Sequence, residues 1–267
     1  MRLWVLGSGS KGNAVLLECG ETRVLVDAGF SARMIGARLR SIGVAPESVD
    51  ALVLTHEHSD HVRGVEVAVR QWGWPVFGTP GTLAALAGLP SPATTLAPDA
   101  RIVIGQIALE PVRTSHDAAE PVAYVATSSC SGMRAAIVTD LGVVTPGVAA
   151  AVRHADVLVL ESNHDEQMLR DGPYPSHLKR RIAGDHGHLS NTAAARLACE
   201  AVHRGLQHLV LAHLSETNNT PGVALASMAG AVRKTRWRGA TTAAPQHGVA
   251  GPFGDAASVA GQLSLAL

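Results

Sequence analysis

The chain has 267 residues, 46% of them apolar and 16% charged, which suits one large domain with a sizeable buried core. Its 22 basic and 22 acidic residues balance, which excludes a strongly basic polyanion-binding protein but leaves room for local basic patches. The 13 histidines outnumber Phe, Trp and Tyr combined. An excess of imidazole in a neutral protein directs attention to metal binding.

The cysteines and the amino-terminal segment indicate a cellular compartment. Cys19, Cys130 and Cys199 lie far apart without a C-x-x-C pair, which is typical of a protein kept in a reducing cytoplasm. The segment 1–13 becomes rich in Gly and Ser after six residues, too early for a signal peptide, and the chain has no apolar run long enough to span a bilayer. We therefore expect a soluble cytoplasmic protein with no membrane association.

Short apolar runs in the first half predict strands separated by Gly-rich turns and two helices. The expected strands are 3–6, 14–18, 23–27, 50–56, 75–78, 101–104, 107–114, 121–128 and 133–140, and the helices are 31–43 and 59–73. In the second half, helices are expected at 146–154, 178–184 and 190–205, and strands at 156–162 and 207–213.

The two halves share a layout in which strands come first and helices follow. This pattern predicts an α/β fold of two mixed β-sheets packed face to face, with helices on the outer faces. The Gly-, Ala- and Pro-rich carboxyl-terminal end has weak patterning. We therefore expect one domain at 1–240 and a partly ordered tail at 241–267.

The segment 55–61, Thr-His-Glu-His-Ser-Asp-His, follows a predicted buried strand and contains an H-x-H-x-D-H pattern. His56 and His58 are two residues apart, so an extended backbone points both side chains the same way and they can bind one metal ion. Asp60 and His61 stand where the next helix begins and can reach a second ion. The alternative for Asp60 or Ser59 is a plain helix N-cap.

Further ligand-type residues follow other predicted strands. His116, Asp140 and His213 each come directly after or at the end of an apolar run, and strand ends that converge at one sheet edge commonly form sites. Asp27 ends the strand 23–27 in the same way, where a turn-forming role is the alternative. Together with segment 55–61, these residues predict a site for two metal ions.

The order and spacing of these residues resemble the five motifs of the metallo-β-lactamase superfamily. Longer strings resemble its YycJ (WalJ) group: GSGSKGN at 7–13, LVDAGFS at 25–31, THEHSDH at 55–61, TDLG at 139–142, LKRRIAGDHGHLSN at 178–191 and AHLSETNN at 212–219. The resemblance covers nearly the entire chain. It implies a four-layer αββα sandwich with two divalent metal ions, zinc or manganese, at one edge.

The resemblance also implies a role for each ligand-type residue. His56, His58 and His116 would hold the first ion, Asp60, His61 and His213 the second, and Asp140 would bridge them. Asp27 would fix the ligand loop through hydrogen bonds. Two adjacent ions lower the pKa of a bridging water and polarise the bond under attack, so the site predicts a hydrolase that uses a bridging hydroxide.

Residues around the expected metal site are candidates for catalysis and substrate binding. Besides Asp60, we expect His188 to act in catalysis, as a proton donor to the leaving group, although segment 185–191 also fits a simple helix start. The candidate substrate-binding residues are Ser8, Ser10, Asn13, Asn163, His164 and Ser190. The alternative for segment 7–13 is a plain Gly-rich hairpin, since it lacks the P-loop pattern.

The YycJ resemblance implies an exonuclease that acts on DNA from 5′ to 3′. Basic clusters at 179–181 and 233–238, the latter containing Trp237, favour DNA or another phosphodiester as the substrate, whereas the neutral net charge weakens that argument. The alternatives are a hydrolase of a small ester, thioester or lactone, and a non-catalytic regulator. The second is disfavoured because all seven ligand-type residues are intact. The sequence leaves the natural substrate, the cleavage polarity, the metal and the oligomeric state open.

Overall fold

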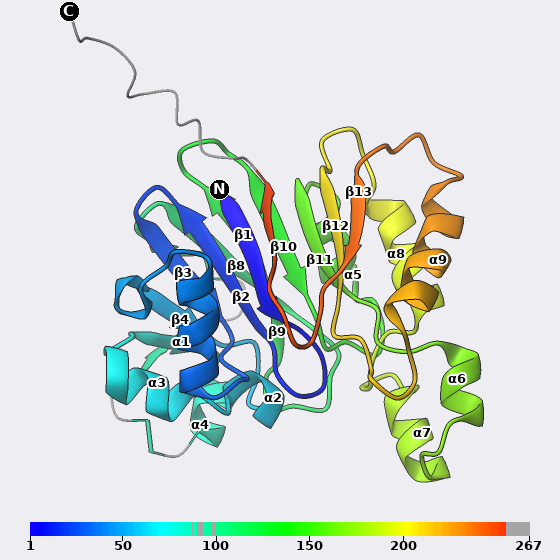
Figure 1. Cartoon of the computed structure of the whole chain (residues 1–267), viewed down its shortest axis with the longest axis horizontal. Coiled ribbons are helices and arrows are strands. Elements are labelled where there is room, and N and C mark those ends of the chain that lie inside the picture. Colours follow the sequence, from blue (N-terminus) through cyan, green and yellow to red (C-terminus); the bar gives the residue numbers. More distant parts are fainter. Residues whose placement is uncertain (87, 90–92, 98–99, 255–267) are drawn as a thin grey trace, which may run out of the picture.

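The computed structural model describes residues 1–86, 88–89, 93–97 and 100–254, and within them two β-sheets pack face to face with helices outside (Figure 1). The predicted αββα arrangement is confirmed. The described helices include none with the length and apolar character needed to cross a membrane.

The first sheet combines antiparallel and parallel pairing. Its spatial order is β14 (Ala250–Gly254), β1 (Arg2–Gly7), β2 (Ala14–Cys19), β3 (Thr22–Val26), β4 (Ala51–Val53), β5 (Val76–Gly78) and β6 (Ala93–Thr95). Pairing is antiparallel from β14 to β3 and parallel from β3 to β6.

The second sheet repeats this layout. Its order is β13 (Ala240–Ala243), β12 (His208–Ala212), β11 (Val157–Glu161), β10 (Arg134–Val138), β9 (Val122–Ser128), β8 (Ile107–Arg113) and β7 (Ile102–Ile104). Strands β10 to β13 are parallel, and β7 to β10 are antiparallel. Each sheet thus has several parallel strands whose carboxyl ends can carry functional loops.

Helices cover the outer face of each sheet. Helices α1 (Ala32–Ser41) and α3 (Val65–Trp72) pack on the first sheet, and α5 (Pro146–Val152), α8 (Asn191–Ala201) and α9 (Pro221–Val232) pack on the second. The shorter helices are the 3₁₀ turn Pro46–Ser48, α2 (Ser59–Val62), α4 (Pro80–Ala85), α6 (Glu166–Asp171) and α7 (Ser176–Ile182). In Figure 1, α2 and α7 lie at the same end of the two sheets.

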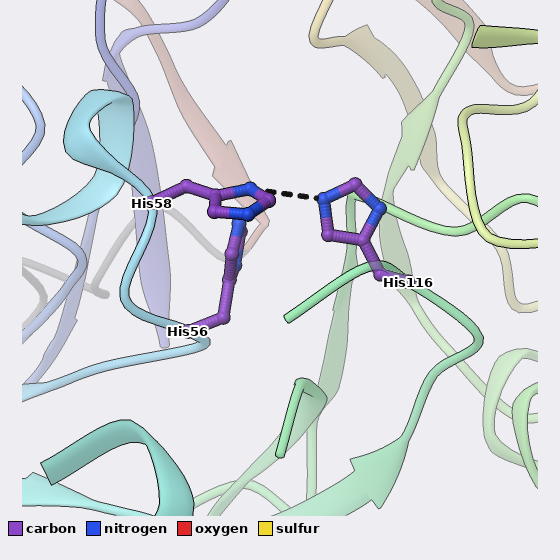
Figure 2. Close-up of side chains that lie close together, drawn as sticks. All are labelled: His56, His58 and His116. Carbon is purple, nitrogen blue, oxygen red and sulfur yellow. Dashed lines mark hydrogen bonds between the residues drawn. The ribbon is translucent and has the colours of Figure 1, made fainter. Parts of the chain in front are cut away.

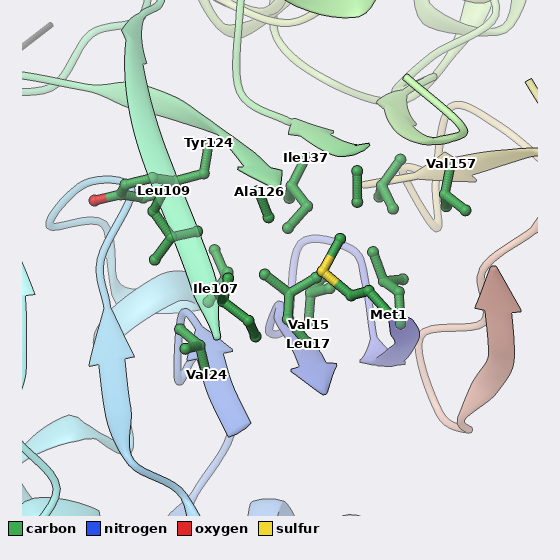
Figure 3. Packing of buried hydrophobic residues seen from close by; sticks show 14 of the residues in the cluster. Met1, Val15, Leu17, Val24, Ile107, Leu109, Tyr124, Ala126, Ile137 and Val157 are labelled. Atoms are coloured by element: carbon green, nitrogen blue, oxygen red, sulfur yellow. The ribbon is translucent and has the colours of Figure 1, made fainter. Parts of the chain in front are cut away.

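Alternation along the strands explains the layers. In β1, Leu3 and Val5 pack in the core between the sheets, whereas Trp4 and Leu6 pack outward under α1 and α3. Figure 3 shows this central core, to which both sheets contribute branched aliphatic side chains. Because residues on both faces of these strands are buried, the strands appear in the sequence as continuous apolar runs.

The structure corrects one predicted helix. The helix expected at 59–73 is broken into α2 and α3 at Gly64. The Gly64 amide donates to the Ala28 carbonyl at 2.8 Å, and a Cβ at this glycine would stand 2.1 Å from the Phe30 carbonyl oxygen. A close backbone approach, which only glycine permits, therefore interrupts the helix.

The segment expected as a tail also needs correction. Residues 240–254 supply β13 and β14, an edge strand for each sheet, so the domain extends beyond residue 240. β13 has no fully buried residue and β14 buries only Phe253, which explains the weak hydrophobic pattern in the sequence. The rest of the predicted tail, 255–267, lies outside the described residues.

A buried tyrosine links the two sheets beneath the histidine-rich loop. The Tyr124 hydroxyl on β9 donates to the Leu54 carbonyl at 2.9 Å, two residues before His56. We expect Tyr124→Phe to lower the free energy of unfolding by about 1–2 kcal/mol, because a buried hydrogen bond is lost. Urea denaturation in metal-saturated buffer measures this change.

The other tyrosine of the chain provides the control. The Tyr174 hydroxyl donates to Thr217 Oγ1 at 3.1 Å on the exposed surface, so Tyr174→Phe should change stability by less than about 0.5 kcal/mol. Equal effects of the two substitutions would contradict the role given to Tyr124.

Candidate metal centre

Seven ligand-type side chains meet at one edge of the two sheets, beyond the carboxyl ends of several strands. Segment 55–61 follows β4, His116 follows β8, Asp140 follows β10 and His213 follows β12. Their donor atoms form three overlapping groups in which all atoms lie within 4.8 Å of one another: His56 with His58 and His116, Asp60 with His61 and His213, and His56 with His61 and Asp140. Figure 2 shows the first group, with all three rings converging.

The backbone turns sharply where three of the site residues leave their strands. Asp27, Asp140 and His213 have φ values of 63°, 59° and 52°, and are the non-glycine residues with positive φ in the described part of the chain. This left-handed conformation is unfavourable for most residues, although Asp and His adopt it more readily than branched ones. Its clustering at one site indicates a functional requirement.

Each of the five histidines has one ring nitrogen against a protein acceptor. This arrangement favours a proton on the anchored nitrogen and leaves the other nitrogen free to bind a metal ion. The anchors are Thr55 Oγ1 for His56 Nδ1 (3.0 Å), the Asp117 carbonyl for His58 Nε2 (3.2 Å), Asp27 Oδ2 for His61 Nδ1 (2.7 Å), the Gly187 carbonyl for His116 Nδ1 (3.0 Å) and Glu161 Oε1 for His213 Nδ1 (3.3 Å).

Asp27 holds the histidine-rich loop at both backbone and side chain. Its Oδ1 accepts from the Thr55 amide at 2.8 Å, and its Oδ2 accepts from the Thr55 hydroxyl at 2.8 Å and from His61 Nδ1 at 2.7 Å. The carboxylate therefore fixes both where the loop starts and how the His61 ring is turned.

The distances between donor atoms fit metal coordination. His58 Nδ1 and His116 Nε2 are 3.2 Å apart (Figure 2), as are His213 Nε2 and Asp60 Oδ2, and His61 Nε2 and Asp140 Oδ2. Ligands bound tetrahedrally to zinc at about 2.0–2.1 Å are separated by about 3.3 Å. The donor pairs thus have the spacing of ligands that share an ion.

Two buried polar atoms support the same interpretation. Among the described residues, His56 Nε2 and Asp140 Oδ2 are inaccessible to solvent and make no hydrogen bond, although Oδ2 lies 3.2 Å from His61 Nε2. Buried polar atoms in native proteins are almost always satisfied. A metal ion at these atoms would satisfy both, so the residues present fit a metal centre.

Charges in the centre compensate one another when no metal is bound. Burial raises the pKa of Asp140, but His213 and His61 outweigh it and hold that pKa well below the usual range. Burial lowers the pKa of both His61 and His213, but nearby carboxylates, Asp140 above all, outweigh it and raise both values well above 6.5. Burial and the neighbouring His61 lower the pKa of His56 instead.

A pocket of about 360 Å³ opens onto the cluster. His188 lines it and lies 2.7 Å through Nδ1 from Glu161 Oε1, while Glu161 Oε2 accepts from the Leu141 and Leu189 amides. Burial raises the pKa of Glu161, but the pairing with His188 and His213 outweighs it and lowers the value to about 2. Glu161 is thus a buried anion that orients both rings.

Comparison with known proteins identifies the family. Residues 22–214 match the family model of the β-lactamase superfamily domain. The chain is 35% identical to exodeoxyribonuclease YycJ of Bacillus anthracis over 232 aligned residues. The alignment covers 84% of this chain and 86% of that protein. It is likewise 35% identical over 231 residues to exodeoxyribonuclease WalJ of Streptococcus pneumoniae, covering 84% and 85% of the two chains. The chain belongs to the metallo-β-lactamase superfamily.

Within that superfamily it belongs to the YycJ/WalJ group. Among solved structures, the metallo-β-lactamase fold protein YhfI from Bacillus subtilis superposes with a TM-score of 0.70 at 19% identity, covering 93% of this chain and 97% of that one. The superposition on YhfI shows that the two chains share the metallo-β-lactamase fold.

Several candidate substrate-binding residues lie behind the centre instead of facing its pocket. Ser8 and Asn13 are only 3% and 4% exposed. Ser8 Oγ accepts from the His213 amide at 2.8 Å, and Asn13 Nδ2 lies 3.1 Å from His61 Nε2. Both side chains are thus buried against the loops that carry the candidate ligands, and neither lines the pocket at the cluster.

Asn163 and Ser190 also have structural partners. Asn163 Nδ2 donates to the His213 carbonyl at 2.9 Å, and Ser190 caps α8 by accepting from the Ala193 amide at 3.2 Å. Of the six candidates, Ser10 alone lines the pocket at the metal-ligand cluster, while His164 lines a neighbouring pocket.

The sequence interpretation did not single out Asp117 of the main pocket, and it named Arg181 only as a member of the basic cluster 179–181. Arg181 on α7 donates through Nε to Asp117 Oδ2 at 2.6 Å, and both residues line the pocket. Asp117 stands directly after a candidate ligand, which is a usable signal, but no local pattern pairs it with an arginine 64 residues away.

The raised pKa values of His61 and His213 predict proton release on metal binding. At neutral pH both rings carry protons that an incoming ion must displace, so apparent metal affinity should fall as pH is lowered, by about tenfold per unit for each displaced proton. Calorimetric titration of the metal-free protein with Zn²⁺ in buffers of different ionisation enthalpy measures the release. Binding without net proton release at pH 7 would contradict this charge distribution.

Proposed function

We propose that this protein is a metal-dependent phosphodiesterase that removes nucleotides from a DNA end, from 5′ to 3′. The observation that carries the proposal is the convergence of seven ligand-type side chains on a pocket that also contains His188 and Arg181. The similarity of this chain to proteins named exodeoxyribonucleases, which extends over most of each chain, supports DNA as the substrate.

The proposal includes two divalent ions, zinc or manganese, since a set of imidazoles and carboxylates without cysteine suits both metals. One would be held by His56, His58 and His116, the other by Asp60, His61 and His213, with Asp140 between them. When bound, such a pair supplies an activated water at neutral pH and polarises the phosphodiester.

The chain's own residues would move the protons. Asp60, whose carboxylate lines the pocket, accepts a proton from the attacking water. His188 gives a proton from Nε2 to the departing sugar oxygen, and the Glu161 carboxylate, 2.7 Å from its Nδ1, keeps the ring turned toward the pocket. This pairing supports a proton-donor role for His188.

Arg181 is the basic residue best placed to bind the scissile phosphate. Its Nε is held by Asp117, which leaves the remaining guanidinium N–H groups for a phosphate oxygen. The free cysteines at 19, 130 and 199 support a location in the reducing cytoplasm, where chromosomal DNA is accessible in bacteria.

The second basic cluster, 233–238, lies at the other end of the sheet. β13 begins at Ala240, which pairs with His208, and His213 stands beyond the opposite end of β12. The Trp237 indole is partly buried and donates to the Leu206 carbonyl at 2.6 Å, so it is not free to stack on a base. We therefore place the scissile phosphate at Arg181 and not at this cluster, which does not line the main pocket.

The direct test is an incubation of manganese- or zinc-loaded protein with DNA labelled at the 5′ or 3′ end, single- and double-stranded. The proposal expects mononucleotides, with the 5′ label released first. No cleavage of any nucleic acid, together with rapid hydrolysis of a thioester or lactone, would replace this function with the small-ester alternative.

Two aspartates should differ in how they affect metal content. We expect about two ions per wild-type chain and fewer in Asp140→Ala, whose carboxylate reaches both groups of ligands. Asp27→Ala should keep both sites but bind metal about 10–100-fold more weakly, because Asp27 acts through His61 and Thr55. Elemental analysis after dialysis against graded metal concentrations measures both. Full metal content and turnover in Asp140→Ala would refute the bridging assignment.

A proton-donor role for His188 predicts dependence on the leaving group. His188→Ala should lower kcat on DNA by about 10²–10⁴, and much less on bis-p-nitrophenyl phosphate, whose leaving group departs without a proton. His154→Ala, at the exposed end of α5, is the control and should match wild type on both substrates. An equal loss on both substrates in the His188 variant would contradict proton donation.

A further inference from the structure

A second pocket of about 360 Å³ lies on the opposite face of α7 from the candidate metal centre. Leu178, Arg181 and Ile182 of this helix line the main pocket, whereas Ser176, Lys179, Arg180 and Ala183 line the second one. These two sets follow helical spacing, so each occupies one side of α7. His164, Glu166, Leu169 and Arg170 complete the second pocket.

The second pocket carries an excess of unpaired positive charge. Within the described part of the chain, Arg170, Lys179 and Arg180 form no ion pair with any carboxylate, and the Arg180 side chain makes no hydrogen bond either. The single carboxylate, Glu166, already accepts from the Ser190 hydroxyl at 2.8 Å and the Thr192 hydroxyl at 3.3 Å. The pocket therefore favours an anionic ligand.

The inner wall of the second pocket combines apolar surface with an unsatisfied ring. Leu169 is buried there, and the stems of Lys179 and Arg170 add aliphatic area. His164 is only 2% exposed, and its Nδ1 has no hydrogen-bond partner among the residues described. A buried ring nitrogen without a partner is costly, by about 1–3 kcal/mol, unless a ligand satisfies it.

We propose that the second pocket binds one nucleotide of the DNA strand whose scissile phosphate lies in the metal centre. The phosphate is held by Lys179 and Arg180, and the base packs on Leu169 with an edge toward His164. This inference rests on the proposed function and adds a subsite to it. A ligand with both a flat ring and a phosphate matches a pocket that has apolar walls and unpaired cations.

The helix sets the distance between the two positions. An α-helix with its side chains is about 10–12 Å across, and a strand advances about 3.4 Å per nucleotide in B-form and more when extended. A strand that crosses α7 therefore reaches the second pocket about two or three nucleotides from the scissile bond. Shorter substrates occupy the metal centre alone.

The experiment compares metal-loaded wild type with Arg180→Ala on DNAs of two, four and six nucleotides. For wild type, kcat/KM should rise steeply between the dinucleotide and the tetranucleotide. Arg180→Ala should lose about tenfold on the longer DNAs, change less than about twofold on the dinucleotide, and show a salt slope shallower by about 0.7. Arg180 is exposed and free of internal bonds, so its removal leaves the fold intact.

Arg236→Ala is the matched control, an exposed arginine of the distant basic cluster that should behave as wild type. Arg170→Ala gives an independent second variant and should share the loss on longer DNAs. An Arg180→Ala enzyme with the wild-type dependence on length would overturn the subsite while leaving the proposed function intact.

A measurement of equilibrium binding shows whether the exonuclease function or the nucleotide subsite in the second pocket has failed. Fluorescence anisotropy with a labelled six-nucleotide phosphorothioate DNA should give binding to wild type that weakens about tenfold in Arg180→Ala. If wild type binds in this way but cleaves no DNA, the subsite stands and the exonuclease function fails. If wild type does not bind this DNA, or Arg180→Ala binds it equally well, the subsite is refuted.

Discussion

The carboxylate of Asp27 is the contact on which the candidate metal centre depends. It holds the Thr55 amide, the Thr55 hydroxyl and the His61 ring at once, from a backbone conformation with φ of 63°. Two residues later, Gly29 lets the chain pass so close to the loop that a Cβ there would stand 1.7 Å from the Asp60 carbonyl oxygen. The end of β3 therefore holds in place the loop that carries most of the candidate ligands, and so connects the first sheet directly to the candidate metal centre.

Because the loop is held in this way, several ionisable side chains are buried close together, and their charges must be neutralised. Asp140 is buried and ionised between His61 and His213, and in the absence of metal both rings carry protons that balance it. A divalent cation supplies that balance instead and frees the ring nitrogens as ligands. Burial of the cluster and metal binding are thus coupled. The cation offsets the cost of burying the carboxylates, and the carboxylates offset the cost of desolvating the cation.

The sequence predicts those parts of the fold and of the candidate site that depend on neighbouring residues, and it fails where contacts between distant residues decide the structure. Most of the candidate ligand residues were predictable because β4, β10 and β12 are apolar runs buried on both faces that end in polar side chains, whereas β8, before His116, is interrupted by Glu110 and Arg113. The break at Gly64 comes from a contact with Phe30, and α9 is so rich in Ala and Gly that it has little amphipathic pattern. The inward orientation of Ser8 and Asn13 was not predictable, because a Gly-rich loop does not indicate which polar side chains turn inward.

The balance of 22 basic and 22 acidic residues, which weakened the argument for a nucleic-acid substrate, carries less weight once the charges are placed. Affinity for DNA depends on the cations near its phosphates, since charges more than about 10 Å away are largely screened in physiological salt. Around α7, Arg170, Lys179 and Arg180 have no carboxylate partner in the described residues, and Arg181 has one. A few local cations on a neutral protein hold a few phosphates and give little affinity for long DNA. That distribution suits an enzyme that works at a strand end, where retention on internal sequence would slow its turnover.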